Sequence, residues 1–123
     1  IDNLDFISMT WKTGLKEAVR KCKIVINPSL WSSPVEGALL KSIKNNGCVA
    51  IVPVDYSFQK EILSDTVIHL ESNISESVKI LNHVIQSHAL ITTYKLNSSK
   101  WLDNYTKSTD HNFDNFIQNH FCQ

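Results

Sequence analysis

Residues 24–54, IVINPSLWSSPVEGALLKSIKNNGCVAIVPV, place two apolar runs on either side of a helical pattern. The runs Lys23–Asn27 and Cys48–Val54 are rich in Val and Ile, which is typical of strands covered by helices on both faces of a parallel sheet. Between them, Pro34–Asn46 has helical spacing, and Gly47 stands where a helix commonly ends. This stretch predicts a strand–helix–strand unit with parallel strands.

The alternation of strand and helix patterns continues on both sides of this unit. Because it does, residues 1–88 are expected to form an α/β domain, a Rossmann-like parallel sheet with helices on both faces. Such sheets bind ligands beyond the carboxyl ends of their strands, so functional residues should follow those ends. The further expected elements are strands at Asp5–Met9 and Thr66–Leu70 and helices at Thr13–Cys22, Ser57–Leu63 and Ser75–His88.

Residues 89–123 differ in character and are expected to form a C-terminal helical extension that packs back on the preceding domain. Residues 89–109 are polar, with Trp101 and Tyr105 as anchors. A terminal helix is predicted at Asp110–Phe121. Its aromatic stripe must pack on another part of the structure. The stripe consists of Phe113, Phe116, Ile117 and Phe121.

Composition narrows the classes of partner and site. Twelve basic residues balance twelve acidic ones in the 123-residue chain, which gives no electrostatic reason to expect nucleic acid. No apolar run reaches the roughly 18–20 residues of a membrane span. The three cysteines are too widely spaced for a metal or redox pair. Cys22 and Cys48 have apolar neighbours and are expected to be buried, reduced thiols, which indicates the cytoplasm.

The start of the helix after Asn27 has the pattern of an anion site. Ser33 suits the N-cap, Pro34 the first helical position, and Glu36 the third, which together make a capping box. Gly37 leaves the first backbone amides open to a ligand, and a helix start attracts phosphate. The same pattern also fits a helix cap that binds nothing, with Glu36 a capping residue only.

The run NPSLWSSPVEGALLKSIKNNGCVAIV, residues 27–52, resembles the signature of the group-one glycosyltransferases of GT-B fold. That pattern has a strand ending in Pro-Ser, an aromatic or acidic turn, a Gly-containing helix start, a helix ending in Gly, and a Val/Ile strand. The corresponding parts here are Pro28–Ser29, Leu30–Ser33, Glu36–Gly37, Gly47 and Val49–Val52. The resemblance extends through Asp55–Ile62, and Asp110–Phe121 looks like the family's terminal helix, which packs across two domains.

The chain departs from this family at its two glutamates. In the family, seven residues separate these glutamates. An alignment through Leu39–Leu40 puts Ser33 at the position of the first glutamate and Lys41 at the position of the second. Glu36 is the only acid in the turn, so donor recognition must differ in detail. The family's early Gly-rich turn and its Arg/Lys pair facing the diphosphate are absent, and would lie before Ile1.

The resemblance implies a glycosyltransferase of polysaccharide or glycan biosynthesis that moves a sugar from a nucleotide-diphosphate donor to an acceptor hydroxyl. It implies retention of configuration, no cofactor and no essential metal. The donor contacts would be Ser33, the backbone amides around Glu36–Ala38 (with Gly37) for phosphate, Glu36 for the sugar, and Lys41 for ribose or phosphate. Glu36 is also the candidate catalytic residue.

The acceptor would bind an N-terminal domain of the same chain, outside these 123 residues. Peripheral attachment to a membrane would also run through that domain. The 123 residues are therefore expected to be inactive alone, and to associate as a dimer or fray through the terminal helix. Apolar faces without a partner promote such association.

The alternative is a non-enzymatic, flavodoxin-like binding or regulatory module. A receiver-type module should carry an acidic cluster after its first strand, and the sequence offers no convincing one. Nucleotide binding separates the two hypotheses. A helical metal pair is not expected, since His83 and His88 are five residues apart rather than four.

Overall fold

The computed structural model describes residues 4–29, 36–52, 54, 62 and 64–121, the last six of these without their side chains. In this part the chain is α/β, and its sheet has three strands in the order β1-β2-β3. Both pairings are parallel, with Val25 opposite Val49 and Ala50 opposite Ile68. The predicted α/β class and parallel sheet are therefore confirmed. The strands are β1 (Val25–Asn27), β2 (Val49–Ile51) and β3 (Ile68–His69).

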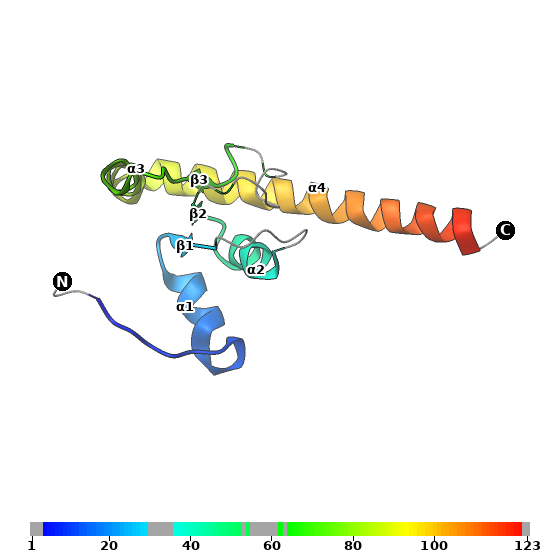
Figure 1. The fold of residues 1–123 in the computed structure, drawn as a ribbon, viewed down its shortest axis with the longest axis horizontal. Coiled ribbons are helices and arrows are strands. Elements are labelled where there is room, and N and C mark those ends of the chain that lie inside the picture. The colour runs from blue at the N-terminus through cyan, green and yellow to red at the C-terminus, as the bar shows by residue number, and fades with distance from the viewer. Residues whose placement is uncertain (1–3, 30–35, 53, 55–61, 63, 122–123) are drawn as a thin grey trace.

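Helices precede, separate and follow the strands (Figure 1). A π-type turn and a short helix come before β1, one helix joins β1 to β2, and two helices follow β3. These are η1 (Trp11–Leu15), α1 (Lys16–Lys21), α2 (Gly37–Asn45), α3 (Ile74–Gln86) and α4 (His88–Phe121). The helix predicted at Ser57–Leu63 lies outside the described residues, apart from Ile62.

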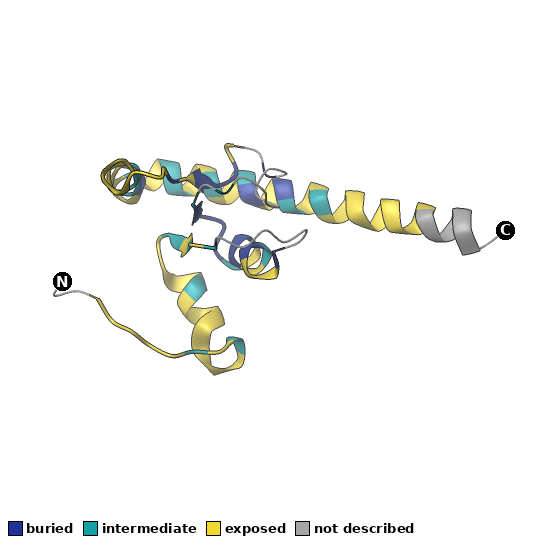
Figure 2. Cartoon of the chain, viewed as in Figure 1, coloured by how far each residue is buried: buried dark blue, intermediate teal, exposed yellow. Residues whose placement is uncertain are grey.

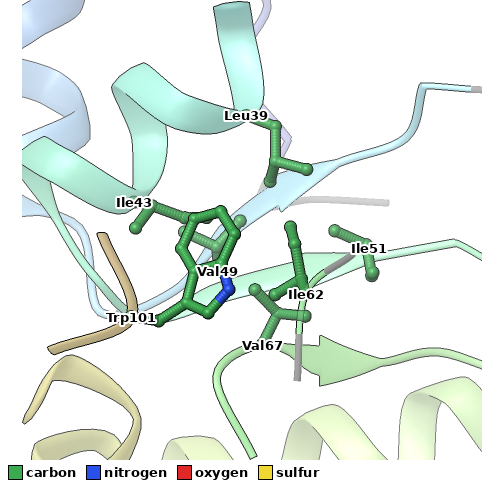
Figure 3. Packing of buried hydrophobic residues seen from close by; sticks show 7 residues of the cluster. All are labelled: Leu39, Ile43, Val49, Ile51, Ile62, Val67 and Trp101. Carbon is green, nitrogen blue, oxygen red and sulfur yellow. The ribbon is translucent and has the colours of Figure 1, made fainter. Parts of the chain in front are cut away.

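Alternation of side chains along β2 divides the core into two clusters, one on each face of the sheet. Val49 and Ile51 belong to the first cluster, which α2 covers (Figure 3). Cys48 and Ala50 belong to the second, which α3 covers through Val84. Helices thus cover both faces. The buried members are Leu39, Ile43, Val49, Ile51, Ile62, Val67 and Trp101 in the first cluster, and Cys48, Ala50, Ile68, Leu70 and Val84 in the second.

Helix α4 contributes to both clusters because it passes the edge of the sheet at which the strands begin. Gly47, just before β2, lies so close to α4 that a Cβ on it would be 3.0 Å from the Lys95 Cα. Near the start of β3, the Asn97 side-chain amide donates to the Asp65 carbonyl at 3.1 Å. Helix α4 therefore crosses the sheet at the amino ends of its strands and not at their carboxyl ends.

The terminal helix predicted at Asp110–Phe121 is not a separate element. It is the end of α4, a single helix of 34 residues, or about 50 Å. Within the polar stretch 89–109, a narrow stripe of apolar and aromatic side chains packs on the core. The stripe consists of Leu90, Ile91, Tyr94, Trp101, Leu102 and Tyr105. The helix continues although threonines are weak helix formers, and hydroxyls such as those of Thr93 and Thr106 donate to the carbonyl four residues earlier.

The strand predicted at Asp5–Met9 is wrong. Residues 4–10 have no regular secondary structure, and Phe6 is 91% exposed. An apolar run forms a strand only beside another strand, and this segment has none. The predicted helix Thr13–Cys22 is interrupted as well, because Gly14, at φ +116°, separates a turn from the short helix α1.

The two described cysteines differ in environment. Cys48 is fully buried, as predicted, whereas Cys22 is exposed, which corrects the prediction of two buried thiols. Both are free thiols. Burial raises the pKa of the Cys48 thiol to about 11, so this cysteine is a neutral core residue at physiological pH.

We predict that Gly47→Ala strongly destabilises the protein. Gly47 has φ +84°, a conformation that costs other residues about 1–2 kcal/mol. The added Cβ would also meet the Ser98 Oγ at 2.8 Å, and overpacking costs about 1–3 kcal/mol more. Denaturant unfolding measures the loss. Gly37→Ala is the control, since a Cβ there meets nothing within 4 Å; equal effects of the two substitutions would contradict the packing of α4 on Gly47.

The distal part of α4 should fray or associate. Residues 106–115 are all exposed (Figure 2), and Phe113 is 63% exposed. A helix without tertiary packing is marginal in water. We therefore expect the amides of residues 106–121 to exchange with solvent faster than those of residues 90–102, with association at high concentration slowing the exchange. A strictly monomeric protein with slow exchange throughout 106–121 would contradict this.

Candidate functional site

Helix α2 begins later than its sequence pattern predicts. Its first residue is Gly37, and Glu36 is the N-cap. The backbone of Glu36 is extended, with φ −100° and ψ 94°, and its side chain makes no capping hydrogen bond. The Glu36 carbonyl accepts the first helical hydrogen bond, from the Leu40 amide at 3.0 Å. Glu36 therefore is not the third helical residue of a capping box, and that prediction is wrong. Ser33 and Pro34 lie outside the described residues.

A cavity of about 440 Å³ lies between the start of α2, the strand β1 and the η1–α1 segment. We call it the Lys41 cavity. Three of the predicted site residues, Gly37, Ala38 and Lys41, line it together, whereas Glu36 is not among its described lining residues. The remaining described lining residues are Trp11, Leu15, Val19, Val25, Ile26, Asn27 and Ser42.

The polar lining of the Lys41 cavity is dominated by hydrogen-bond donors. The first amides of α2 have no acceptor inside the helix, and the helix dipole makes that end positive. Lys41 adds a full positive charge one turn later. The Ser42 hydroxyl is already used as a donor, to the Ala38 carbonyl at 2.9 Å. No acidic residue occurs in the described lining, so the cavity suits an anion.

Asn27 adds a donor that sequence reasoning did not assign. Its side-chain nitrogen Nδ2 is buried and has no hydrogen-bond acceptor. An unsatisfied buried donor costs about 1–3 kcal/mol, and such groups in native proteins call for an explanation. Asn27 is the last residue of β1, at the sheet edge where ligands bind in parallel α/β folds. That position was the signal available in the sequence.

Lys41 has an aromatic neighbour in the same cavity. Its Nζ lies 5.5 Å from the centroid of the Trp11 ring, which is within the range of a cation–π interaction. Trp11 is half-buried, whereas residues 12–18 after it are exposed. No local pattern predicts this pairing, because Trp11 and Lys41 are thirty residues apart in the sequence.

Two other cavities of similar size are less suited to an anion. One, of about 480 Å³, lies at the start of α3 and includes Glu71 with the apolar side chains of Ile74 and Val78. The other, of about 470 Å³, lies along α4 and includes Asp65. A carboxylate in the wall would repel a phosphate; Glu71 is the one charged residue in the described lining of the first cavity, whereas Lys100 lies with Asp65 in the lining of the second.

Comparisons with protein-family models, with curated proteins and with solved structures found no match to this chain. Among the described residues, no group of three or more His, Cys, Asp or Glu side chains is placed to hold a metal ion. The same part of the chain contains no helix that is both long and apolar enough to cross a membrane.

We predict that Glu36→Gln leaves both stability and anion binding nearly unchanged. Glu36 is buried, but it makes no capping bond through its side chain and Gln has nearly the same size and shape, so the main loss is the favourable charge at the helix start, about 0.3–1 kcal/mol. It also lies outside the described lining of the Lys41 cavity. Unfolding curves and a pyrophosphate titration check both parts. A tenfold loss of pyrophosphate affinity would place Glu36 in the anion site itself.

Proposed function

We propose that this chain forms the donor-binding part of a GT-B type glycosyltransferase, in which the Lys41 cavity holds the diphosphate of a nucleotide sugar. The observation that supports this is the convergence of donors from two elements, with Asn27 from β1 and Gly37, Ala38 and Lys41 from α2. These residues belong to the segment whose sequence resembles the family.

The chemistry of sugar transfer fits such a site. As the bond between sugar and diphosphate breaks, negative charge grows on the leaving phosphate. Preorganised amides and a nearby cation stabilise that charge without having to rearrange. In this proposal the amides of Gly37 and Ala38 face the phosphate, Lys41 binds phosphate or ribose, and Glu36 contacts the donor sugar from the edge of the site.

The acceptor side of the reaction would be supplied elsewhere. We propose that an N-terminal domain of the same protein binds the acceptor hydroxyl, and that the enzyme serves polysaccharide or glycan synthesis in the cytoplasm. The 123 residues alone should then bind nucleotide without transferring sugar. Sugar transfer by the purified 123-residue chain would contradict this division of labour.

The decisive experiment is an NMR titration of the chain with a nucleoside diphosphate. We expect shifts at Asn27 and the amides of residues 36–41, with affinity lowered about tenfold or more by Lys41→Ala, since a charged contact contributes about 1.5–3 kcal/mol. Lys44→Ala is the matched control, because Lys44 is exposed on the same helix and does not line the cavity. Equal losses from both would indicate non-specific charge attraction.

Gly37→Ala tests the amides separately from the charge. No atom lies within 4 Å of the Cβ it would add, so the free protein should keep its stability or gain about 0.4–1 kcal/mol. A phosphate in contact with the amides would meet the new methyl group, and binding should weaken. Unchanged affinity in this stable variant would remove the helix start from the site, and a chain that binds no nucleoside diphosphate would favour the non-enzymatic module.

A further inference from the structure

We infer that Trp11 is a positioning residue, which holds the Lys41 ammonium at the anion site through a cation–π contact. This inference rests on the proposed function, because it assigns a role within the same cavity. Trp11 would act through Lys41 and not on the reacting atoms. The Lys41 Nζ lies 5.5 Å from the centroid of the Trp11 ring.

Within the part of the chain that the structure describes, the Lys41 ammonium has no other charged partner that would fix its position. The ion pairs of the described residues are Arg20–Glu17 and Lys79–Glu76, and neither involves Lys41. A lysine side chain is long and flexible, so an unrestrained ammonium spends little time at any one place. The indole ring restrains it, yet a ring takes no N–H donor away from an arriving phosphate, as a carboxylate would.

Trp11 is itself held in place by its local turn. The Thr10 amide donates to the Thr13 Oγ1 at 2.8 Å, and the Leu15 amide donates to the Thr10 carbonyl at 3.1 Å. Gly14 supplies the positive φ of +116° that lets the chain turn into α1. The turn therefore holds Trp11 in the lining of the Lys41 cavity.

A pyrophosphate titration of four proteins tests the role: wild type, Trp11→Leu, Lys41→Ala and the double variant. We expect Trp11→Leu to weaken binding about two- to fivefold, the usual range for an exposed cation–π pair, and to have no further effect when Lys41 is already Ala. Phe6→Leu is the control, because Phe6 is 91% exposed and outside the cavity. An equal loss in the Lys41→Ala background would overturn the inference, and so would tighter binding in Trp11→Leu.

A nucleoside diphosphate is the second probe, because an indole can also stack on a base. A positioning role predicts the same fold-change for pyrophosphate and for a nucleoside diphosphate, with Trp11→Phe restoring part of the affinity. A loss seen only with the nucleoside diphosphate would identify Trp11 as a base-stacking platform and overturn positioning.

A readout without ligand separates this inference from the proposed function. The ring current of Trp11 should shift the Lys41 Hε protons upfield in wild type, and Trp11→Leu should abolish that shift. An absent shift in wild type overturns the positioning role whatever the chain binds. A clear shift in a protein that binds neither probe overturns the proposed function, and the role of Trp11 in binding falls with it.

Discussion

The close approach of α4 to Gly47 is the contact on which the rest of the structure depends. Gly47 follows Asn46, the C-cap of α2, and its φ of +84° turns the chain toward β2. Because it has no side chain, the backbone of α4 comes within 3.0 Å of the place a Cβ would occupy. At that position α4 reaches both faces of the sheet, and its side chains pack against each of the two core clusters.

The residue before Gly47 extends this constraint to the candidate site. The Asn46 Nδ2 donates to the carbonyls of Val19 at 2.7 Å and Cys22 at 2.8 Å, and its Oδ1 accepts from the Cys48 amide at 3.1 Å. None of the residues in α1 is buried, so these bonds contribute much of what holds α1 in place. The wall of the Lys41 cavity that α1 and Trp11 form therefore depends on a side chain in the turn that α4 covers.

The sequence predicted the parts of the fold that local pattern determines. Apolar runs such as Val49–Ile51 form parallel strands, and Gly47 lies just after the end of α2, as expected. The predictions were wrong where contacts with residues distant in the sequence determine the secondary structure. Asp5–Met9 has strand-like residues but no neighbouring strand, and α4 continues through a polar stretch because its narrow stripe meets the core. The capping box failed because Glu36 takes the N-cap with extended backbone, a choice among adjacent residues that pattern alone leaves open.

The candidate site shows the same division between local and distant information. Gly37, Ala38 and Lys41 were found from the sequence because one helix carries all three. Asn27 and Trp11 come from other elements, and only folding brings them to the cavity. An unsatisfied amide at Asn27 opposes folding, and a positive helix end beside Lys41 adds like-charge repulsion. An anion would relieve both, so the groups that lower the stability of the free protein are the ones that would bind it.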